Sequence, residues 1–294
     1  AAVTNTGNAK ITLDDAHTLS ELKAINNATT GAITLNTKTV ALSGAADVIA
    51  AALAGFTDYT GNISFTDFHT VDELAAINNA TSGSFTFPTI GGSSGRQVRL
   101  IASASTIIDA LTGITNYLGA TWIDDSASSN VSATDITTIK GLSTGTTKLN
   151  NAFTVTGTSN QISTALTGIY AQDANVSLGD AHTLAELKTI NNATTGTITF
   201  NTKTVALTGS ADDITAALTG VTSYTGNVVL NTDHDLAELK LINNAHTGAT
   251  LTLNTKTVAL TGSSSDVAAA LTGITAYTGT VTLNTDHDLA ELKT

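Results

Sequence analysis

Apolar and polar positions along the chain follow one pattern that returns about every 52 residues, and residues 176–227 show it most clearly. Val176–Leu178 alternates like a strand that buries one face. Thr183 and Glu186 have the spacing of a capping box, in which each side chain bonds a backbone N–H at the start of a helix. A helix is therefore predicted to follow, with apolar positions at Leu184, Leu187 and Ile190 and an end at Asn191, Asn192 and Gly196.

The second half of the same unit repeats the order of strand and helix. Ile198–Phe200 is predicted to be a second strand, and Val205–Leu207 a short third one. Ser210 opens a second helix with Asp213 in its first turn, and Gly220 is placed to end it. The apolar stripe of this helix has the i, i+3, i+4, i+7 spacing of an amphipathic helix, at Ile214, Ala217, Leu218 and Val221.

Copies of this unit predict one solenoid over residues 1–294. The third copy departs furthest from the pattern, because residues 122–125 (Trp-Ile-Asp-Asp) stand at its first strand and the INNAT sequence is lost. The chain begins with Ala and stops two turns into a capped helix, so we expect a piece of a longer protein. The predicted copies are residues 11–62, 63–120, 121–175, 176–227, 228–280 and, in part, 281–294.

The half-units predict the fold class, an α/β repeat solenoid with a parallel β-sheet. Each half, of about 22 or 30 residues, is near the repeat length of leucine-rich-repeat-like solenoids, although the LxxLxLxxN sequence is absent. Helices need about 8–10 Å between axes and strands about 4.8 Å, so an array with every helix on one face must curve. An array with helices on both faces could run straight. Because apolar residues alternate with Thr along the strands, one face is expected to meet water, which favours the one-sided, curved array.

Composition narrows the class of protein. A net charge of −12 disfavours nucleic acid and anionic membrane surfaces as partners. No apolar run approaches the ~18 residues of a membrane-spanning helix, so we expect no membrane insertion, and we recognise no signal peptide. With no Cys and 4% aromatic residues, the core is expected to be thin, built from small side chains and free of disulfides.

An acidic position recurs just after the first strand of each copy. Carboxylate oxygens are ligands that calcium prefers, so this row could hold calcium between successive turns. Alternatively these residues cap helices and keep the bend soluble, and the half-units between them carry Thr at the matching place. No cofactor is required on either interpretation, and calcium is the metal that this row suggests. The row consists of Asp15, Asp67, Asp125, Asp180, Asp233 and Asp286, the last two displaced by one position.

A histidine stands just before the first helix in five copies. Stacked imidazoles could bind a transition metal or sense pH. A single histidine per copy, with no Cys beside it, favours instead a residue that packs or bonds just before the helix cap. The row consists of His17, His69, His182, His234 and His287.

An Asn pair ends the first helix in four copies. In a solenoid, Asn side chains can bond backbone groups of the neighbouring turn. Three of the pairs also begin Asn-Ala-Thr, an N-glycosylation pattern, but the fourth copy has His246 in place of Thr, which favours the structural role. The pairs are Asn26–Asn27, Asn78–Asn79, Asn191–Asn192 and Asn243–Asn244.

Two surfaces could contact a partner. The Thr residues on the open strand face resemble the Thr arrays of ice-binding solenoids, but Asn and Lys interrupt them, as in residues 36–38. Residues 88–99 expand a loop that holds the one Pro and both Arg residues of the chain. This loop is either a contact site or a tolerated surface excursion.

The sequence predicts no enzyme. It lacks the motifs of the common hydrolases, metalloproteases and nucleotide-binding proteins. The enzymatic alternative is a β-helix-like protein that acts on polysaccharide, which would need acids unique to one turn. The candidates are Asp124, Asp125 and Asp135 in the third copy.

The sequences ELKxINNATTGxIT and NTKTVALTGSADD, with TYTGN-like joints, resemble the repeats of giant cell-surface proteins of marine cyanobacteria, of the swimming and adhesion type. The resemblance rests on residues 184–192 and their copies, covers nearly the whole chain and is weakest at about 88–175. It implies an exported, extracellular, structural or motility-linked protein that can depend on calcium. It brings no catalytic residues.

These observations favour a non-catalytic structural segment of a large exported surface, filament, S-layer or adhesion protein. Its expected partners are neighbouring repeats of the same chain or further copies in a larger assembly, because exposed sheet ends invite stacking. The alternative is a glycan- or protein-binding module that uses the strand face or the 88–99 loop. A polysaccharide-acting enzyme is the second alternative.

Overall fold

The protein is α/β in a computed structural model that describes residues 7–88, 97–115, 117–171, 173–247 and 250–286. Within these ranges the chain forms ten helices and several small parallel sheets. Clustering of contacts divides it into two compact units. The first is Ala1–Asp125 with Asp135–Asn150, and the second is Ser126–Thr134 with Asn151–Thr294.

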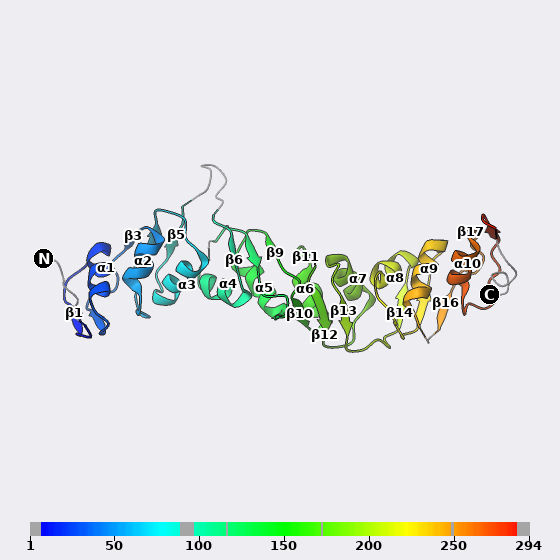
Figure 1. Cartoon of the computed structure of the whole chain (residues 1–294), viewed down its shortest axis with the longest axis horizontal. Helices are drawn as coiled ribbons and strands as arrows, with labels where there is room; N and C mark the ends of the chain where they lie inside the picture. Colours follow the sequence, from blue (N-terminus) through cyan, green and yellow to red (C-terminus); the bar gives the residue numbers. More distant parts are fainter. Residues whose placement is uncertain (1–6, 89–96, 116, 172, 248–249, 287–294) are drawn as a thin grey trace. The chain divides into compact units, whose positions relative to one another are not determined.

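The first compact unit alternates short strands with short helices. Its elements are β1 (Ile11–Leu13), α1 (Leu19–Ala28), β2 (Ile33–Leu35), β3 (Leu42–Gly44), α2 (Ala46–Leu53), β4 (Ile63–Phe65), α3 (Val71–Ala80), β5 (Phe85–Thr86), β6 (Leu100–Ala102), α4 (Ala104–Leu111), β7 (Thr121–Ile123), most of α5 (Ala133–Leu142), and β9 (Thr147–Leu149). Helices α1 to α4 pack on one another in chain order, as can be followed in Figure 1.

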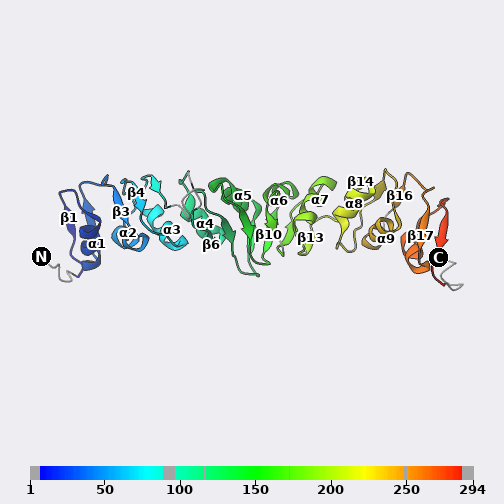
Figure 2. The same ribbon diagram turned by 90° about the horizontal axis from the view of Figure 1, so that it is seen from above.

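The second compact unit continues the same alternation. Its elements are β8 (Asn130–Ser132), β10 (Thr154–Gly157), α6 (Ser159–Leu166), β11 (Tyr170–Ala171), β12 (Asn175–Leu178), α7 (Leu184–Ala193), β13 (Ile198–Phe200), β14 (Leu207–Gly209), α8 (Ala211–Leu218), β15 (Val228–Leu230), α9 (Leu236–Ala245), β16 (Leu251–Leu253), β17 (Leu260–Gly262), α10 (Ser264–Leu271) and β18 (Val281–Leu283). Helices α6 to α10 also pack in chain order (Figure 2).

The strands form separate small sheets instead of the one continuous sheet expected from the sequence. The first unit contains β1-β2, β3-β4-β5 and β6-β7-β9, and the second contains β8-β10-β12-β13, β14-β15-β16 and β17-β18. Partners such as β3 and β4, or β14 and β15, pair in parallel across an intervening helix. The sheet breaks between β2 and β3, where residues 36–41 connect the strands without a helix. Parallel partners need a crossover of a dozen or more residues, so this short link cannot pair the two strands.

Most of the short strands have one side toward the core. In β4, Ile63 and Phe65 are buried while Ser64 between them is only half-buried. In β1 and β2 the paired middle residues, Thr12 and Thr34, are exposed. This alternation agrees with the expectation that one strand face meets water.

The helix boundaries in residues 176–227 confirm the predicted caps. The Thr183 hydroxyl accepts a bond from the Glu186 N–H at 3.2 Å, and Glu186 Oε2 accepts one from the Thr183 N–H at 2.8 Å. The Ser210 hydroxyl accepts a bond from the Asp213 N–H at 3.1 Å. Gly220 follows the C-terminus of α8 with φ of +71°, a conformation that favours glycine.

The core is built from the predicted apolar stripes. Leu187 and Ile190 of α7 and Ile214 and Leu218 of α8 are fully buried, with small alanines such as Ala217 between them. Small side chains let neighbouring segments approach closely, so the packing is thin but dense.

The predictions about how the chain is organised have three different outcomes. The third copy has an additional strand, β8, directly before α5, which the sequence analysis did not predict. Residues 89–96 of the 88–99 loop lie outside the described residues. The single solenoid over residues 1–294 remains a prediction.

Candidate functional site

The acidic row supplies caps to helices that begin earlier in the chain. Three of its carboxylates each accept a bond from the first backbone N–H of α2, α4 or α6, 21 residues upstream. The first N–H groups of a helix have no partner within the helix and carry partial positive charge, which a carboxylate satisfies. The pairs are Asp67 with Ala46 at 2.9 Å, Asp125 with Ala104 at 2.8 Å and Asp180 with Ser159 at 2.7 Å.

The displacement of this row by one position in the later copies has a structural reason. Thr232 occupies the capping position, and its hydroxyl accepts a bond from the Ala211 N–H at 3.0 Å. Asp233 is therefore displaced to the exposed position next to His234. Asp15 and Asp286, the remaining members, are also exposed.

No group of three or more His, Cys, Asp or Glu arranged for a metal ion occurs among the described residues. The six carboxylates belong to six different copies, and three of them bond backbone N–H groups. Calcium at this row remains a prediction.

The histidine row is buried and bonded to tyrosine. His182 is 3% exposed, and its Nε2 lies 2.9 Å from the Tyr224 hydroxyl. Because the Tyr224 hydroxyl donates to the Val205 carbonyl at 2.8 Å, its oxygen accepts from His182 Nε2–H. The Nε2 atom of His182 therefore carries a proton. The same arrangement recurs in the pairs His17 with Tyr59 at 3.1 Å and His234 with Tyr277 at 3.3 Å.

His69 is held differently. Its Nδ1 donates to the Thr70 carbonyl at 3.2 Å, so its proton lies on the other nitrogen. Its ring packs within an aromatic cluster, with centroid distances of 5.4 Å to Phe65, 5.4 Å to Phe87 and 5.9 Å to Tyr117. His287 lies outside the described residues.

Burial controls the titration of these pairs. Desolvation lowers the pKa of His182 from its usual value of 6.5, against the opposing charges of Glu186 and Asp180. Burial likewise lowers the pKa values of His17, His69 and His234. Burial raises the pKa of the Tyr59 hydroxyl to about 12. Both partners are therefore neutral near pH 7, which fits packing and bonding before the helix cap.

The first Asn of each pair caps the C-terminus of the following helix. Asn191 Nδ2 donates to the carbonyls of Ala216 at 2.8 Å and Thr219 at 2.9 Å, at the end of α8. The last carbonyls of a helix have no partner within it, so this amide satisfies groups that would otherwise need water. Asn26, Asn78 and Asn243 make equivalent bonds to the ends of α2, α4 and α10. The predicted backbone-bonding role is confirmed for the first Asn of each pair.

The Thr of the Asn-Ala-Thr sequence also has a structural role. Thr194 is 6% exposed, and its hydroxyl donates to the Ala174 carbonyl at 2.5 Å. In the copy that lacks this Thr, His246 Nε2 bonds the equivalent Gly226 carbonyl at 3.1 Å. Ser143 does the same in the third copy, donating to the Gly119 carbonyl at 2.6 Å. The position therefore selects a side chain that bonds a carbonyl just before the preceding strand.

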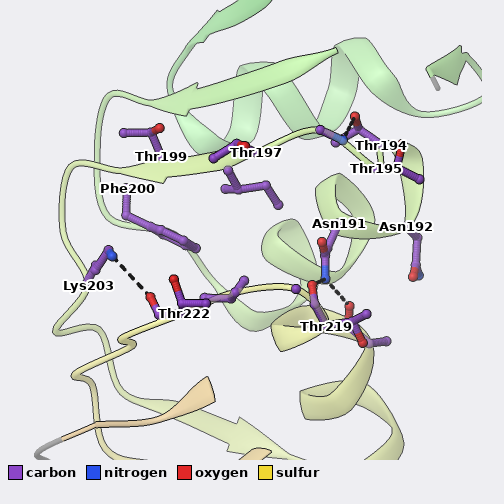
Figure 3. Close-up of a pocket in the computed structure, with 15 residues that line it drawn as sticks. Asn191, Asn192, Thr194, Thr195, Thr197, Thr199, Phe200, Lys203, Thr219 and Thr222 are labelled. Atoms are coloured by element: carbon purple, nitrogen blue, oxygen red, sulfur yellow. Dashed lines mark hydrogen bonds between the residues drawn. The ribbon is translucent and has the colours of Figure 1, made fainter. Parts of the chain in front are cut away.

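A groove of about 640 Å³ opens beside β13, the last strand of its sheet. Figure 3 shows Thr197, Thr199 and Phe200 on one wall and Thr219 and Thr222 on the other. Lys203 Nζ closes one end by donating to the Thr222 carbonyl at 3.3 Å, and Asn191 bonds Thr219 across the floor (Figure 3). The lining contains hydroxyl, amide and apolar groups and one ammonium, but no carboxylate or imidazole.

The same groove recurs in the first copy. A space of about 270 Å³ is lined there by Asn26, Thr29 and Phe56, which match Asn191, Thr194 and Val221. In both copies the groove follows the last strand of a sheet, where the next strand belongs to a different sheet. The groove is thus a consequence of how the sheets end.

The acids considered for catalysis are occupied elsewhere. Asp124 accepts a bond from Asn150 Nδ2 at 2.7 Å, as Asp14 does from Asn36 in the first copy. Asp125 caps α4, and Asp135 lies in the first turn of α5. These three carboxylates therefore have the positions of repeat and capping residues.

The histidine–tyrosine pairing was not predicted from the sequence. A signal was present, because His17 and Tyr59, and also His182 and Tyr224, are separated by 42 residues. A constant spacing between two residue types across copies indicates that they meet at the same place in each copy.

No family model, curated protein or solved structure matches this chain. Among the described residues, no helix has the length and hydropathy needed to cross a membrane.

Proposed function

We propose that the chain is a repeat solenoid, leucine-rich-repeat-like and curved, that serves as a non-catalytic structural segment of a large exported surface, filament or adhesion protein. The observation that carries this proposal is that the recurring polar residues bond the backbone of neighbouring half-repeats. Asp180, Asn191, Thr194 and Tyr224 all bond backbone atoms 19 to 28 residues away.

Bonds of this range join each half-repeat to the next one. The stability of such an array is the sum of the free energies of the individual repeats and of the contacts between neighbouring repeats. The number of repeats can therefore vary without loss of the fold. Function then lies in the length, the spacing and the exposed surface of the array. The net charge of −12 keeps such a chain soluble, and the absence of Cys removes any dependence on redox conditions.

Deletion of one whole repeat tests the solenoid. Removing residues 176–227 joins equivalent positions, so we expect a folded protein with unchanged helicity per residue and a shorter maximum dimension in small-angle X-ray scattering. Removing residues 176–213 instead breaks the period and should cause local unfolding. If both deletions unfold the whole chain equally, the protein has one global core and is not a solenoid.

Labelling of cells tests the proposed location. An antibody against the folded repeats should bind intact cells that carry the full-length protein as well as it binds permeabilised ones. Binding only after permeabilisation would overturn the exported surface role. Sedimentation of the purified protein at rising concentration tests its self-association, which the proposal expects between copies of the repeat.

The calcium hypothesis has its own test. Thermal unfolding followed by circular dichroism in EDTA, and then with calcium titrated back, should show a saturable rise in Tm if the acidic row holds calcium. An unchanged Tm would leave Asp67, Asp125 and Asp180 as helix caps alone.

A further inference from the structure

The outward face of one sheet differs from that of the others. At the middle position of the strands, most sheets carry Thr or Ser, as in Thr12 with Thr34 and Thr261 with Thr282. The sheet of β6, β7 and β9 carries instead Ile101, Trp122 and Lys148, aligned side by side by the strand register. Three neighbouring strands have therefore departed from the repeat at the same position.

Two cations converge on the tryptophan of this face. Arg99 Cζ lies 3.8 Å from the centroid of a Trp122 ring, and Lys148 Nζ lies 4.6 Å from it. Ile101, at 39% exposed, extends the apolar part of the surface. A guanidinium stacked on an indole keeps its in-plane N–H groups directed outward, and the stacking restricts its rotamers before any ligand arrives.

These cations differ in their partners from three other lysines of the chain, which lie in ion pairs. Lys38, Lys188 and Lys240 each form an ion pair with an Asp, whereas among the described ion pairs none involves Arg99 or Lys148. The nearest acid along the chain, Asp124, directly follows β7 and accepts a bond from Asn150 Nδ2. Two cations beside one ring repel each other unless an anion lies between them.

We infer that the Arg99–Trp122–Lys148 face binds a carboxylated polysaccharide. The ligand carboxylate lies against the two cations, and Arg99 donates to it in the bidentate manner that guanidinium favours. The apolar C–H face of the sugar ring packs on Ile101 and on the exposed part of Trp122. A uronic acid residue presents both groups on one rigid ring, whereas a peptide carries them on separate flexible side chains, and a row of side chains across three neighbouring strands suits a polymer.

The overall charge makes this inference specific. A chain of net charge −12 repels polyanions at long range, so binding of one requires a local site. Non-specific attraction, which accounts for many polyanion complexes of basic proteins, is not available here.

The intrinsic fluorescence of the protein gives a direct test, because Trp122 is the only Trp in the chain. Oligogalacturonate titrated into the full-length chain at low salt should shift or quench the emission saturably. A neutral galactose oligomer of equal length should leave the emission unchanged. No change with oligogalacturonate, or an equal change with the neutral oligomer, would overturn the proposal.

Variants identify the residues responsible. Arg99→Gln combined with Lys148→Gln should weaken binding by at least about tenfold, because charge-assisted bonds are lost. Lys188→Gln, which removes a cation elsewhere, should leave it unchanged. Equal weakening in the control would indicate a general charge effect and overturn the site.

Two further measurements test the role of Trp122 and the alternative that the ligand is an acidic peptide. Trp122→Thr restores the residue type of the other sheets, suits a strand, and should abolish binding measured by calorimetry. Melting curves confirm that each variant folds, and if the double variant does not, Lys148→Thr alone is measured. Oligoglutamate that binds as tightly as oligogalacturonate would assign the face to acidic peptides and overturn the polysaccharide ligand.

Discussion

The repeat at residues 176–227 and the third copy at residues 121–175 solve the same packing problem with different chemistry. In the regular repeat, the buried His182 bonds the hydroxyl of Tyr224 before the start of the next strand. The third copy has no histidine, and the buried residues Val131, Phe153 and Val155 lie in and beside its strands. The third copy therefore contains no buried imidazole whose protonation would change the stability of the fold when the pH falls.

Acid should destabilise the regular repeats most. Because burial lowers the pKa values of His17, His69, His182 and His234 below 6.5, the unfolded chain binds protons that the folded chain does not. The contribution of these histidines to the free energy of unfolding is therefore fully present above pH 6.5. It falls as the pH drops below 6.5, until the pKa values of the folded state are reached. The loss is at most about 1.4 kcal/mol per pH unit for each histidine.

The pH window separates the histidines from the capping glutamate Glu21. Bonds with Thr18 lower the pKa of Glu21 from 4.5, so its contribution is lost only below that value. Burial raises the pKa of another capping glutamate, Glu238, so urea unfolding between pH 7 and pH 4.5 should report the histidines when it is measured in a Glu238→Gln background. Replacing the four buried histidines with Gln should reduce the slope of the free energy of unfolding against pH, whatever the effect on its value at pH 7. Hydrogen exchange should show no comparable change with pH in the third copy. A slope that survives the replacement contradicts this assignment.

A glycine pair gives the largest expected effect of a single substitution. A Cβ on Gly226 would lie 1.8 Å from the Val205 carbonyl oxygen, whereas one on Gly141, in α5 of the third copy, would meet no atom within 4 Å. Gly226→Ala should cost about 2–4 kcal/mol because backbone must move. Gly141→Ala should stabilise by about 0.5–1 kcal/mol, since it sits inside a helix. Equal Tm values for the two variants would show that the close approach at Gly226 is not required.

Substitution of a capping Asn has the next largest expected effect on stability. Asn191→Ala leaves carbonyls at the end of α8 without their donor and should cost about 1–2 kcal/mol, seen as faster amide exchange in α8 and a lower urea midpoint. Asn192→Ala is the matched control, because the adjacent side chain is exposed, and should change stability by less than about 0.5 kcal/mol. Similar losses from both variants would count against the capping role.

The sequence was sufficient for features that depend on nearby residues. Thr183 with Glu186, Ser210 and Gly220 mark helix ends because their bonds and angles are local, and all of them were predicted. The Asp row was read as a capping position, but its partner was not identified. A carboxylate that caps a helix 21 residues upstream and one that caps its own bend look alike in sequence.

Which strands pair with one another could not be predicted from the sequence, for a related reason. The three-residue strands β2 and β3 show the same alternation, and nothing in that alternation says which of them pairs with β4. Sheet breaks depend on the length of the link between strands. The Trp122 face was missed because Arg99 and Lys148 are 49 positions apart and converge only through strand register.

The ion pair between helices should matter least. Lys188 of α7 pairs with Asp213 of α8, both partly exposed, and the bond lowers the pKa of Asp213 below 3.8. A lowered carboxylate pKa stabilises above the unfolded value and is lost as the pH falls below it. The third copy carries Thr137 at the position of Lys188, so Lys188→Thr makes the regular repeat resemble it. Exposed pairs contribute little, so the change in urea midpoint should be the smallest of the series and should vanish in 1 M salt. A large loss that persists in salt would mean that the lysine stem packs between α7 and α8, and that the difference between the copies lies in packing and not in charge.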